Sequence, residues 1–203
     1  MLHNNTRKVL FILLQMRSSL VQTVSASSHL DIIKKTNKIG TNPGILINQP
    51  PKFNNVPLTF CSYISKWYKN IYTSFAPWII FNTQAQIVYA CAGDSFSLMR
   101  SGHWLPWHEK FLCSSIEEML EKYPTPKKFH IDFINFFKTL DPQEVYPDLS
   151  PQQARTTYRL DECFRSDYSK RNWCNEIAFK KPTEIYDIQV FVWKEELLKI
   201  LSK

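Results

Sequence analysis

The stretch from Asn70 to Gly93, NIYTSFAPWIIFNTQAQIVYACAG, carries no charged side chain, although Lys69 precedes it and Asp94 follows it. A transmembrane helix needs about 20 mostly apolar residues, because each residue adds about 1.5 Å toward a hydrocarbon core of about 30 Å. Ser74 is a suitable N-cap, and Pro77 falls in the first turn, where proline is tolerated. The length therefore predicts one transmembrane helix within residues 70–93.

Polar residues interrupt the middle of this stretch and set a condition on the prediction. Asn82, Gln86 and Tyr89 follow i, i+4, i+7 spacing, so they would share one face of a helix. In lipid, such a stripe needs hydrogen-bond partners on neighbouring helices. We therefore expect Asn82, Gln86 and Tyr89 to form a helix-docking stripe within a multi-helix complex.

A second interpretation explains the polar middle without a membrane. The sequence WIIF-NTQA-QIVYACA divides into two short segments rich in β-branched and aromatic residues around a polar turn. This pattern is typical of a β-hairpin in the core of a folded domain. A buried core helix is the remaining possibility for the same residues.

Aromatic residues flank the stretch on both sides. Trp67 and Tyr68 stand beside lysines just before it, and Trp104 and Trp107 follow it. Tryptophan and tyrosine concentrate at the two membrane–water interfaces, so these four residues are candidate interface aromatics. Trp104 and Trp107 are equally compatible with a corner of a hydrophobic core.

The basic excess of the chain belongs to its N-terminal half. Residues 1–93 hold nine Lys and Arg against Asp31 alone, which leaves sixteen bases and seventeen acids for residues 94–203. Residues 1–35 hold five of these nine bases, together with apolar residues that cover one helical face between Val9 and Val24. Such a basic, amphipathic, acid-poor segment is typical of a mitochondrial leader. A secretory signal with Val9–Leu14 as its apolar region, and an ordinary structured basic helix, are the alternatives.

Two further regions complete the predicted organisation. Residues 36–69 are rich in Asn, Pro, Gly and Thr without periodicity, which predicts an extended linker lying on a partner's surface. Residues 94–203 predict a small helical C-terminal domain, with helices over 109–123, 129–140, 150–172 and 183–201. Ser150, followed by Pro151 and Gln153, is a helix-start signature. The expected fold class is therefore mainly α.

Cysteine and histidine spacings give weak signals of chemistry. Cys163 and Cys174 lie eleven residues apart, about 16 Å on an unbroken helix, so they are possible disulfide cysteines only with other partners. His103, His108, Cys91 and Cys113 offer metal-ligand atoms but lack the local pairs that zinc sites favour. The four glycines are scattered along the chain, so they form no glycine-rich phosphate loop. The sequence also contains no nucleophile motif. We expect no catalytic residue, metal or cofactor.

These patterns lead to a functional expectation with one main rival. The leader and the predicted span indicate a non-catalytic accessory subunit of a mitochondrial inner-membrane complex of the respiratory chain. Its expected partners are other subunits and lipid, and no small-molecule substrate is expected. The positive-inside bias would place the N-terminus in the matrix and residues 94–203 in the intermembrane space. The alternative is a mitochondrial ribosomal protein that binds rRNA through its basic N-terminal half. In that case Lys66–Tyr72 and Tyr158–Arg171, which interleave bases with aromatics, would contact RNA. A secreted or enzymatic domain is a third class.

Overall fold

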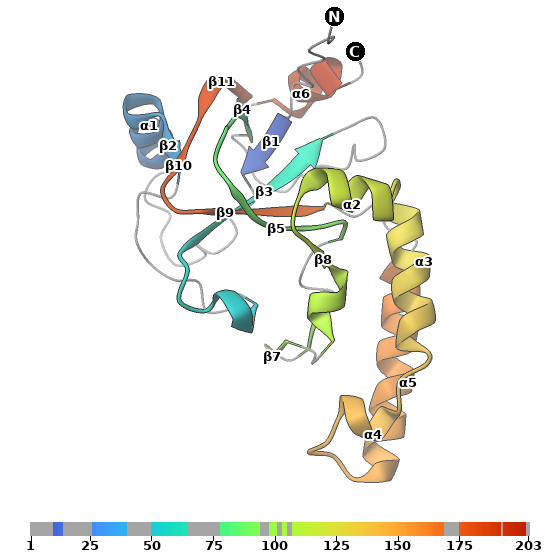
Figure 1. The fold of residues 1–203 in the computed structure, drawn as a ribbon. Coiled ribbons are helices and arrows are strands. Elements are labelled where there is room, and N and C mark those ends of the chain that lie inside the picture. The colour runs from blue at the N-terminus through green and yellow to red at the C-terminus, as the bar shows by residue number, and fades with distance from the viewer. Residues whose placement is uncertain are drawn as a thin grey trace, which may run out of the picture.

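The computed structural model describes residues 10–13, 26–39, 50–64, 78–93, 98–100, 103–104, 107–168, 175–191 and 193–201. These residues form a mixed α/β fold in which a bent antiparallel sheet carries a projecting pair of helices (Figure 1). The prediction of a mainly α protein is wrong. Strands form within the segments that were predicted to be a leader, a linker, a transmembrane helix and a C-terminal helix.

Seven strands of the described chain form the main sheet, in the order β11-β4-β1-β3-β9-β5-β8, and each neighbouring pair is antiparallel. Their bounds are β1 (Leu10–Leu13), β3 (Leu58–Ile64), β4 (Trp78–Asn82), β5 (Ile87–Cys91), β8 (Leu112–Cys113), β9 (Glu176–Lys180) and β11 (Tyr186–Phe191). Two small ladders pair β2 (Lys38–Ile39) with β10 (Thr183–Glu184) and β6 (Met99–Arg100) with β7 (His103–Trp104).

The uncharged stretch supplies two strands of this sheet. No helix among the described residues has the length and apolar character needed to cross a membrane, so the predicted transmembrane helix and the inner-membrane topology built on it are wrong. Residues 78–82 and 87–91 are rich in β-branched and aromatic side chains, which pack well on a pleated surface. The polar residues between them form a connector, where Thr83 donates its hydroxyl to the Glu184 carbonyl at 2.6 Å. Residues 70–77 lie outside the described residues.

The two strands are not a hairpin with one another. Strand β4 lies between β11 and β1, whereas β5 lies between β9 and β8. Four strand-to-strand steps of about 4.8 Å separate them in the sheet order, roughly 19 Å if the sheet were flat. The five residue steps from Asn82 to Ile87 span at most about 17 Å. The sheet must therefore bend back on itself.

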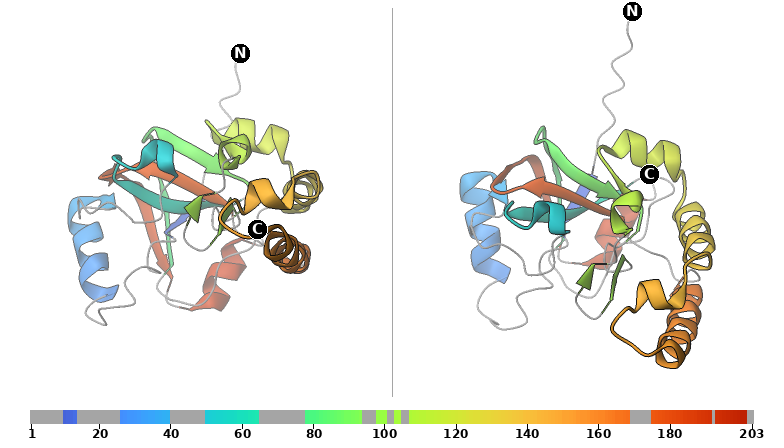
Figure 2. Two further views of the ribbon diagram at one scale, coloured as in Figure 1. Left: turned by 90° about the horizontal axis from the view of Figure 1, so that it is seen from below. Right: turned by 60° about the horizontal axis from the view of Figure 1, so that its bottom comes forward.

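The pairing register shows how this bend is built. Residues 78–91 and 176–191 run antiparallel beside one another, from the Trp78–Phe191 pair to the Cys91–Glu176 pair. In each segment the strand is broken at the same point of the pairing. Strand β4 ends at Asn82, and its partner Tyr186 is the first residue of β11. Strands β1 and β3 fill the space between β4 and β9 (Figures 1 and 2). The result is a curved sheet with one continuous hydrophobic core.

The N-terminal predictions change accordingly. Leu10–Leu13 is the inner strand β1, so the helical-face interpretation of the leader is wrong for these residues. A helix does form later, as α1 (Ala26–Thr36). Residues 1–9 and 14–25 lie outside the described residues.

The predicted linker also contains an element of the core. Its residues Leu58–Ile64 form β3, which pairs with β1 on one side and β9 on the other. The segment Pro51–Phe53 is a short 3-10 helix with proline at its start. An extended linker over the whole of residues 36–69 is therefore wrong, because β-type residues at its end are buried by two neighbouring strands.

The helices between β8 and β9 form the second part of the molecule. A 3-10 helix (His108–Phe111) is followed by α2 (Ile116–Lys122), α3 (Pro126–Phe137), α4 (Pro142–Val145) and α5 (Pro151–Tyr168). Helices α3 and α5 lie side by side and extend away from the sheet, with α4 at the far end (Figures 1 and 2). We call α3, α4 and α5 the arm. The last predicted helix begins only with α6 (Lys194–Leu201), because residues 183–191 are in β10 and β11.

Candidate functional site

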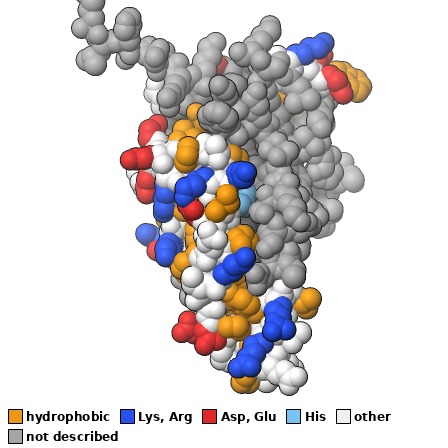
Figure 3. Space-filling model, turned by 90° about the vertical axis from the view of Figure 1, so that its right-hand side faces the viewer, with side chains coloured by type: hydrophobic (Ala, Val, Ile, Leu, Met, Phe, Trp, Pro, Cys, Tyr) orange, Lys and Arg blue, Asp and Glu red, His pale blue; other side chains and the backbone are white. Residues whose placement is uncertain are grey.

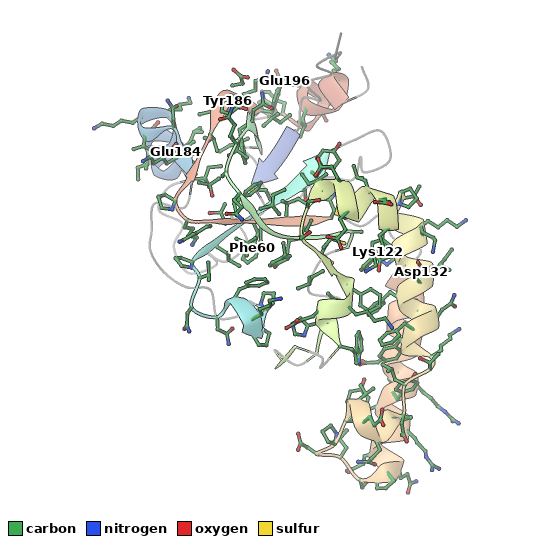
Figure 4. The ribbon with its side chains drawn as sticks, in the orientation of Figure 1. Phe60, Lys122, Asp132, Glu184, Tyr186 and Glu196 are labelled. Carbon is green, nitrogen blue, oxygen red and sulfur yellow. The ribbon has the colours of Figure 1, made fainter. Side chains whose placement is uncertain are left out.

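A buried polar pair lies in the middle of the sheet. Tyr89 of β5 is 1% exposed, and its hydroxyl donates to Oε1 of Glu176 on β9 at 2.7 Å. Phe53 of the short 3-10 helix stacks on the Tyr89 ring at 5.5 Å between centroids. Phe60 of β3 lies against the same ring at 6.4 Å (Figure 4). A phenol hydrogen bond and a cover of aromatic rings thus hold a carboxylate within the core.

Asn175 extends the β3–β9 ladder beyond its last backbone pair. Its side chain accepts from the Tyr63 amide and donates to the Tyr63 carbonyl, both at 2.7 Å. The Ser62 hydroxyl donates to the Asn175 carbonyl at 2.8 Å. If the register of the Cys61–Ile177 pair is continued, Tyr63 lies opposite Asn175. At this position the asparagine side chain makes the hydrogen bonds that a backbone partner would make. The cluster is a structural clip that satisfies buried backbone groups.

Burial shifts the pKa values of four core groups, Cys61, Cys113, Tyr123 and His130, in the direction that favours their neutral forms. Desolvation, with a smaller contribution from Glu176, raises the pKa of the Cys61 thiol. Desolvation also raises the pKa of the Cys113 thiol to about 11 and the pKa of the Tyr123 phenol, and it lowers the pKa of His130 to about 4. An activated cysteine or tyrosine nucleophile needs a lowered pKa instead, and the buried His130 has no such nucleophile to serve as a base among these groups. These groups therefore act as core side chains.

The predicted docking stripe is distributed over the sheet. Asn82 is the last residue of β4, and its side-chain amide donates to the Asp187 carboxylate at 2.8 Å. Gln86 is exposed in the connector, and Tyr89 is the buried tyrosine of β5. The three residues therefore do not share a helical face, because the period of a strand replaces that of a helix.

The other predicted site residues have separate locations. Trp67, Tyr68 and Cys174 lie outside the described residues, Trp104 is in β7, and Cys163 is in α5. Among the described residues, no group of three or more His, Cys, Asp and Glu side chains is arranged to hold a metal.

Trp107 is the one predicted interface aromatic whose side-chain contacts are defined. It is half-buried and packs edge-on against Phe111, Phe136 and Phe137 at centroid distances of 5.2–6.3 Å. Trp107 contacts both the main core and the smaller core within the arm. Lys110 lies over the Phe136 ring at 4.0 Å, a favourable cation–π geometry. This aromatic cluster joins the arm to the sheet.

The arm has its own small core. The Phe137 ring of α3 stacks on the Tyr158 ring of α5 at 4.7 Å, and the Tyr158 hydroxyl donates to the Phe137 carbonyl. Val145 and Tyr146 of the α4 segment and Ala154 of α5 complete this core. The Gln143 amide donates to the carbonyl of Leu149 at 2.9 Å, which ties the turn between α4 and α5. The arm is therefore fixed by packing along its inner side.

The opposite side of the arm is exposed and mixes cations with aliphatic residues. On α3 this side carries Lys127, Ile131, Asn135 and Lys138, which are spaced about one turn apart. On α5 the exposed residues include Arg155, Arg159 and Leu160. We call these seven residues the outer face of the arm. In Figure 3, Lys and Arg side chains with hydrophobic side chains between them are spread along this side of the molecule.

The exposure of Leu160 distinguishes this surface. Leu160 is 68% exposed and Ile131 is 45% exposed, although most large aliphatic side chains of the described residues are buried or half-buried. The segment Tyr158–Arg171, which interleaves bases with aromatics, contains Arg159, whereas no sequence pattern indicated the exposed aliphatic residues. A signal in the sequence does exist for Leu160. This leucine lies on the polar side of an amphipathic helix, opposite Ala154 and Tyr158.

No protein-family model, curated protein or solved structure matches this chain. The outer face of the arm is the best-supported candidate, since the polar groups of the sheet mainly bond one another.

Proposed function

We propose that the protein is a non-catalytic structural subunit that joins a larger assembly through the outer face of its arm. The observation that carries this proposal is the exposure of Leu160 beside Arg155 and Arg159 on an element fixed by its own core. A preformed surface loses little conformational entropy when a partner binds. Exposed aliphatic side chains on such a surface are a feature of binding sites.

The proposal keeps only part of the sequence-based expectation. A structural role in an assembly stays a prediction, whereas the inner-membrane part rested on a span that the described residues do not contain. The charges of the arm support a protein partner over RNA. Residues 126–168, which span the arm, hold six bases and seven acids, so the arm as a whole is not basic. A nucleic-acid surface is normally strongly basic.

The experiment compares native assemblies in extracts of cells that make the protein. The test variant is Ile131→Glu with Leu160→Glu, and the matched control is Ile32→Glu with Trp193→Glu. The two control residues are 42% and 66% exposed and lie on α1 and just before α6. The tagged wild type and the control should migrate well above the 24.0 kDa of one chain, and the arm variant should shift toward it.

Two results would count against the proposal. One is a wild-type protein that already migrates as a single chain. The other is a control variant that loses the assembly as fully as the arm variant. Dissociation of the assembly by ribonuclease would instead support the ribosomal alternative.

A further inference from the structure

We propose that the outer face of the arm binds an acidic amphipathic helix of a protein partner. This inference rests on the proposed function and specifies the chemistry of the partner. It draws on three features of the arm, which are the arrangement of its exposed side chains, the way its acidic residues are used, and the burial of its aromatic rings.

The exposed side chains form two rows on neighbouring helices. Arg155 and Arg159 are one turn apart on α5, and Leu160 adjoins them. Lys127, Ile131 and Lys138 follow the same side of α3. Stacking of Phe137 on Tyr158 holds the two helices together. Each row thus combines positive charge with one aliphatic side chain, the arrangement that an amphipathic partner helix complements.

Several acidic side chains of the arm already have partners within the molecule. Asp132, labelled in Figure 4, lies on α3 and forms an ion pair with Lys128 of the same helix. Asp141 caps α4 by accepting from the Gln143 amide at 2.8 Å, and Asp161 accepts from the Tyr146 hydroxyl at 2.5 Å. The seven residues of the outer face include four bases and no acid, so this face is basic although the arm as a whole is not. An acidic partner is favoured there by charge complementarity.

Among the arm residues whose side chains the structure describes, the aromatic rings favour a protein partner over RNA. Single-stranded nucleic acid binds to exposed aromatic rings on which its bases stack. Tyr158, the tyrosine that begins the candidate RNA segment of α5, is only 8% exposed and its ring is covered by Phe137. The exposed apolar side chains on this face are the aliphatic Ile131 and Leu160. Aliphatic contacts suit the apolar stripe of a helix.

The test is a selection from a displayed library of random peptides of about 16 residues, roughly 24 Å when helical. The full-length protein is the bait. Selection is repeated with Arg155→Glu combined with Arg159→Glu, with Leu160→Gln, and with the control Lys35→Glu combined with Lys180→Glu. Both control lysines are exposed and lie outside the arm. Circular dichroism and thermal unfolding establish that each variant is folded.

The expected result is enrichment of acidic peptides with aliphatic residues at i, i+3 or i+4 spacing. A synthetic peptide of the enriched sequence should bind the double arginine variant and the Leu160 variant at least about tenfold more weakly than the wild type. Binding to the control should be unchanged. The affinity for the wild type should fall as ionic strength rises.

Three outcomes would overturn the inference. They are enrichment without acidic residues, no enrichment, and binding that is unaffected by the arm variants. Tighter binding of a single-stranded RNA of the same length than of the peptide would also overturn it. If the arm variants still lose the native assembly in any of these cases, the proposed function stands and only the acidic-helix partner fails.

Discussion

At the scale of single residues, Gly93 and Phe129 show how closely the sheet and α3 are packed. A Cβ atom at Gly93 would lie 2.3 Å from Cε1 of Phe129. Phe129 is fully buried and is held by the rings of Phe111, Tyr123 and Phe133, so it has little room to move. We expect Gly93→Ala to lower the free energy of unfolding by about 1–3 kcal/mol, measured by urea denaturation.

A second substitution tests whether this cost comes from the Phe129 contact. Phe129→Leu alone should destabilise the protein through loss of buried volume. Combined with Gly93→Ala, it should cost less than the sum of the two single changes, because the smaller side chain makes room for the added methyl group. Strictly additive costs would show that the close approach does not determine the effect.

His130 predicts a pH dependence of stability. Burial lowers its pKa to about 4, from about 6.5 for an unperturbed histidine. Between these two values the unfolded chain binds a proton that the folded chain does not, so stability falls as the pH is lowered from about 6.5 to about 4. Above about pH 6.5 the effect is absent.

The comparison is between wild type and His130→Phe in urea unfolding at a series of pH values. The wild type should lose up to about 3 kcal/mol more than the variant across this range, since the variant carries no titrating group at this position. Parallel stability curves for the two proteins would contradict a buried neutral His130.

At the scale of elements, the start of α5 agrees with its sequence signature. The Ser150 hydroxyl accepts from the Gln153 amide at 3.4 Å, and the Gln153 side chain accepts from the Ser150 amide at 3.1 Å. This is the reciprocal capping box that Ser150 and Gln153 predict. Ser150→Ala should therefore lower the unfolding free energy by about 1 kcal/mol, measured by thermal or urea unfolding.

The matched control for the cap is Ser150→Thr, which keeps a side-chain oxygen at the same position. Its unfolding free energy should stay within a few tenths of a kcal/mol of the wild-type value. Equal destabilisation by alanine and threonine would indicate that the hydroxyl does not cap the helix.

Local signals predicted some elements and failed at others for a physical reason. Helices α3 and α5 follow from periodicity and caps within their own residues. The segments 58–64, 78–91 and 183–191 depend on partners far away in the chain, such as the β3–β9 and β4–β11 pairs. An uncharged run carries the same composition whether lipid or neighbouring strands bury it. The division of residues 78–91 into two strands was one of the alternatives, but their separation in the sheet was not.

The candidate site was predictable only where its signals lie within one helix. Arg155 and Arg159 are evident on an amphipathic helix, and Leu160 stands out on its polar side. That Tyr158 points inward follows from its contact with Phe137, which the sequence does not reveal. Asn175 and Glu176 were missed because their roles depend on Tyr63 and Tyr89, more than eighty residues away.

At the scale of the whole molecule, the bent sheet and the arm have different relations to their surroundings. The sheet buries two polar clusters, the Tyr89–Glu176 pair and the Asn175 clip. In the arm, Phe137, Tyr146 and Tyr158 pack inward, whereas the cations and aliphatic side chains of the outer face are exposed. We therefore propose that the sheet is the scaffold of the protein and that the arm is its contact surface.

Site-specific photo-crosslinking in cells tests this claim most directly. A photoreactive amino acid replaces Leu160 in one variant and Trp193 in another, two positions that are 68% and 66% exposed. After irradiation, we predict a covalent adduct with a partner protein from position 160 and none of comparable yield from position 193. No adduct at position 160, or equal adducts at both positions, would contradict the assignment of the arm as the contact surface.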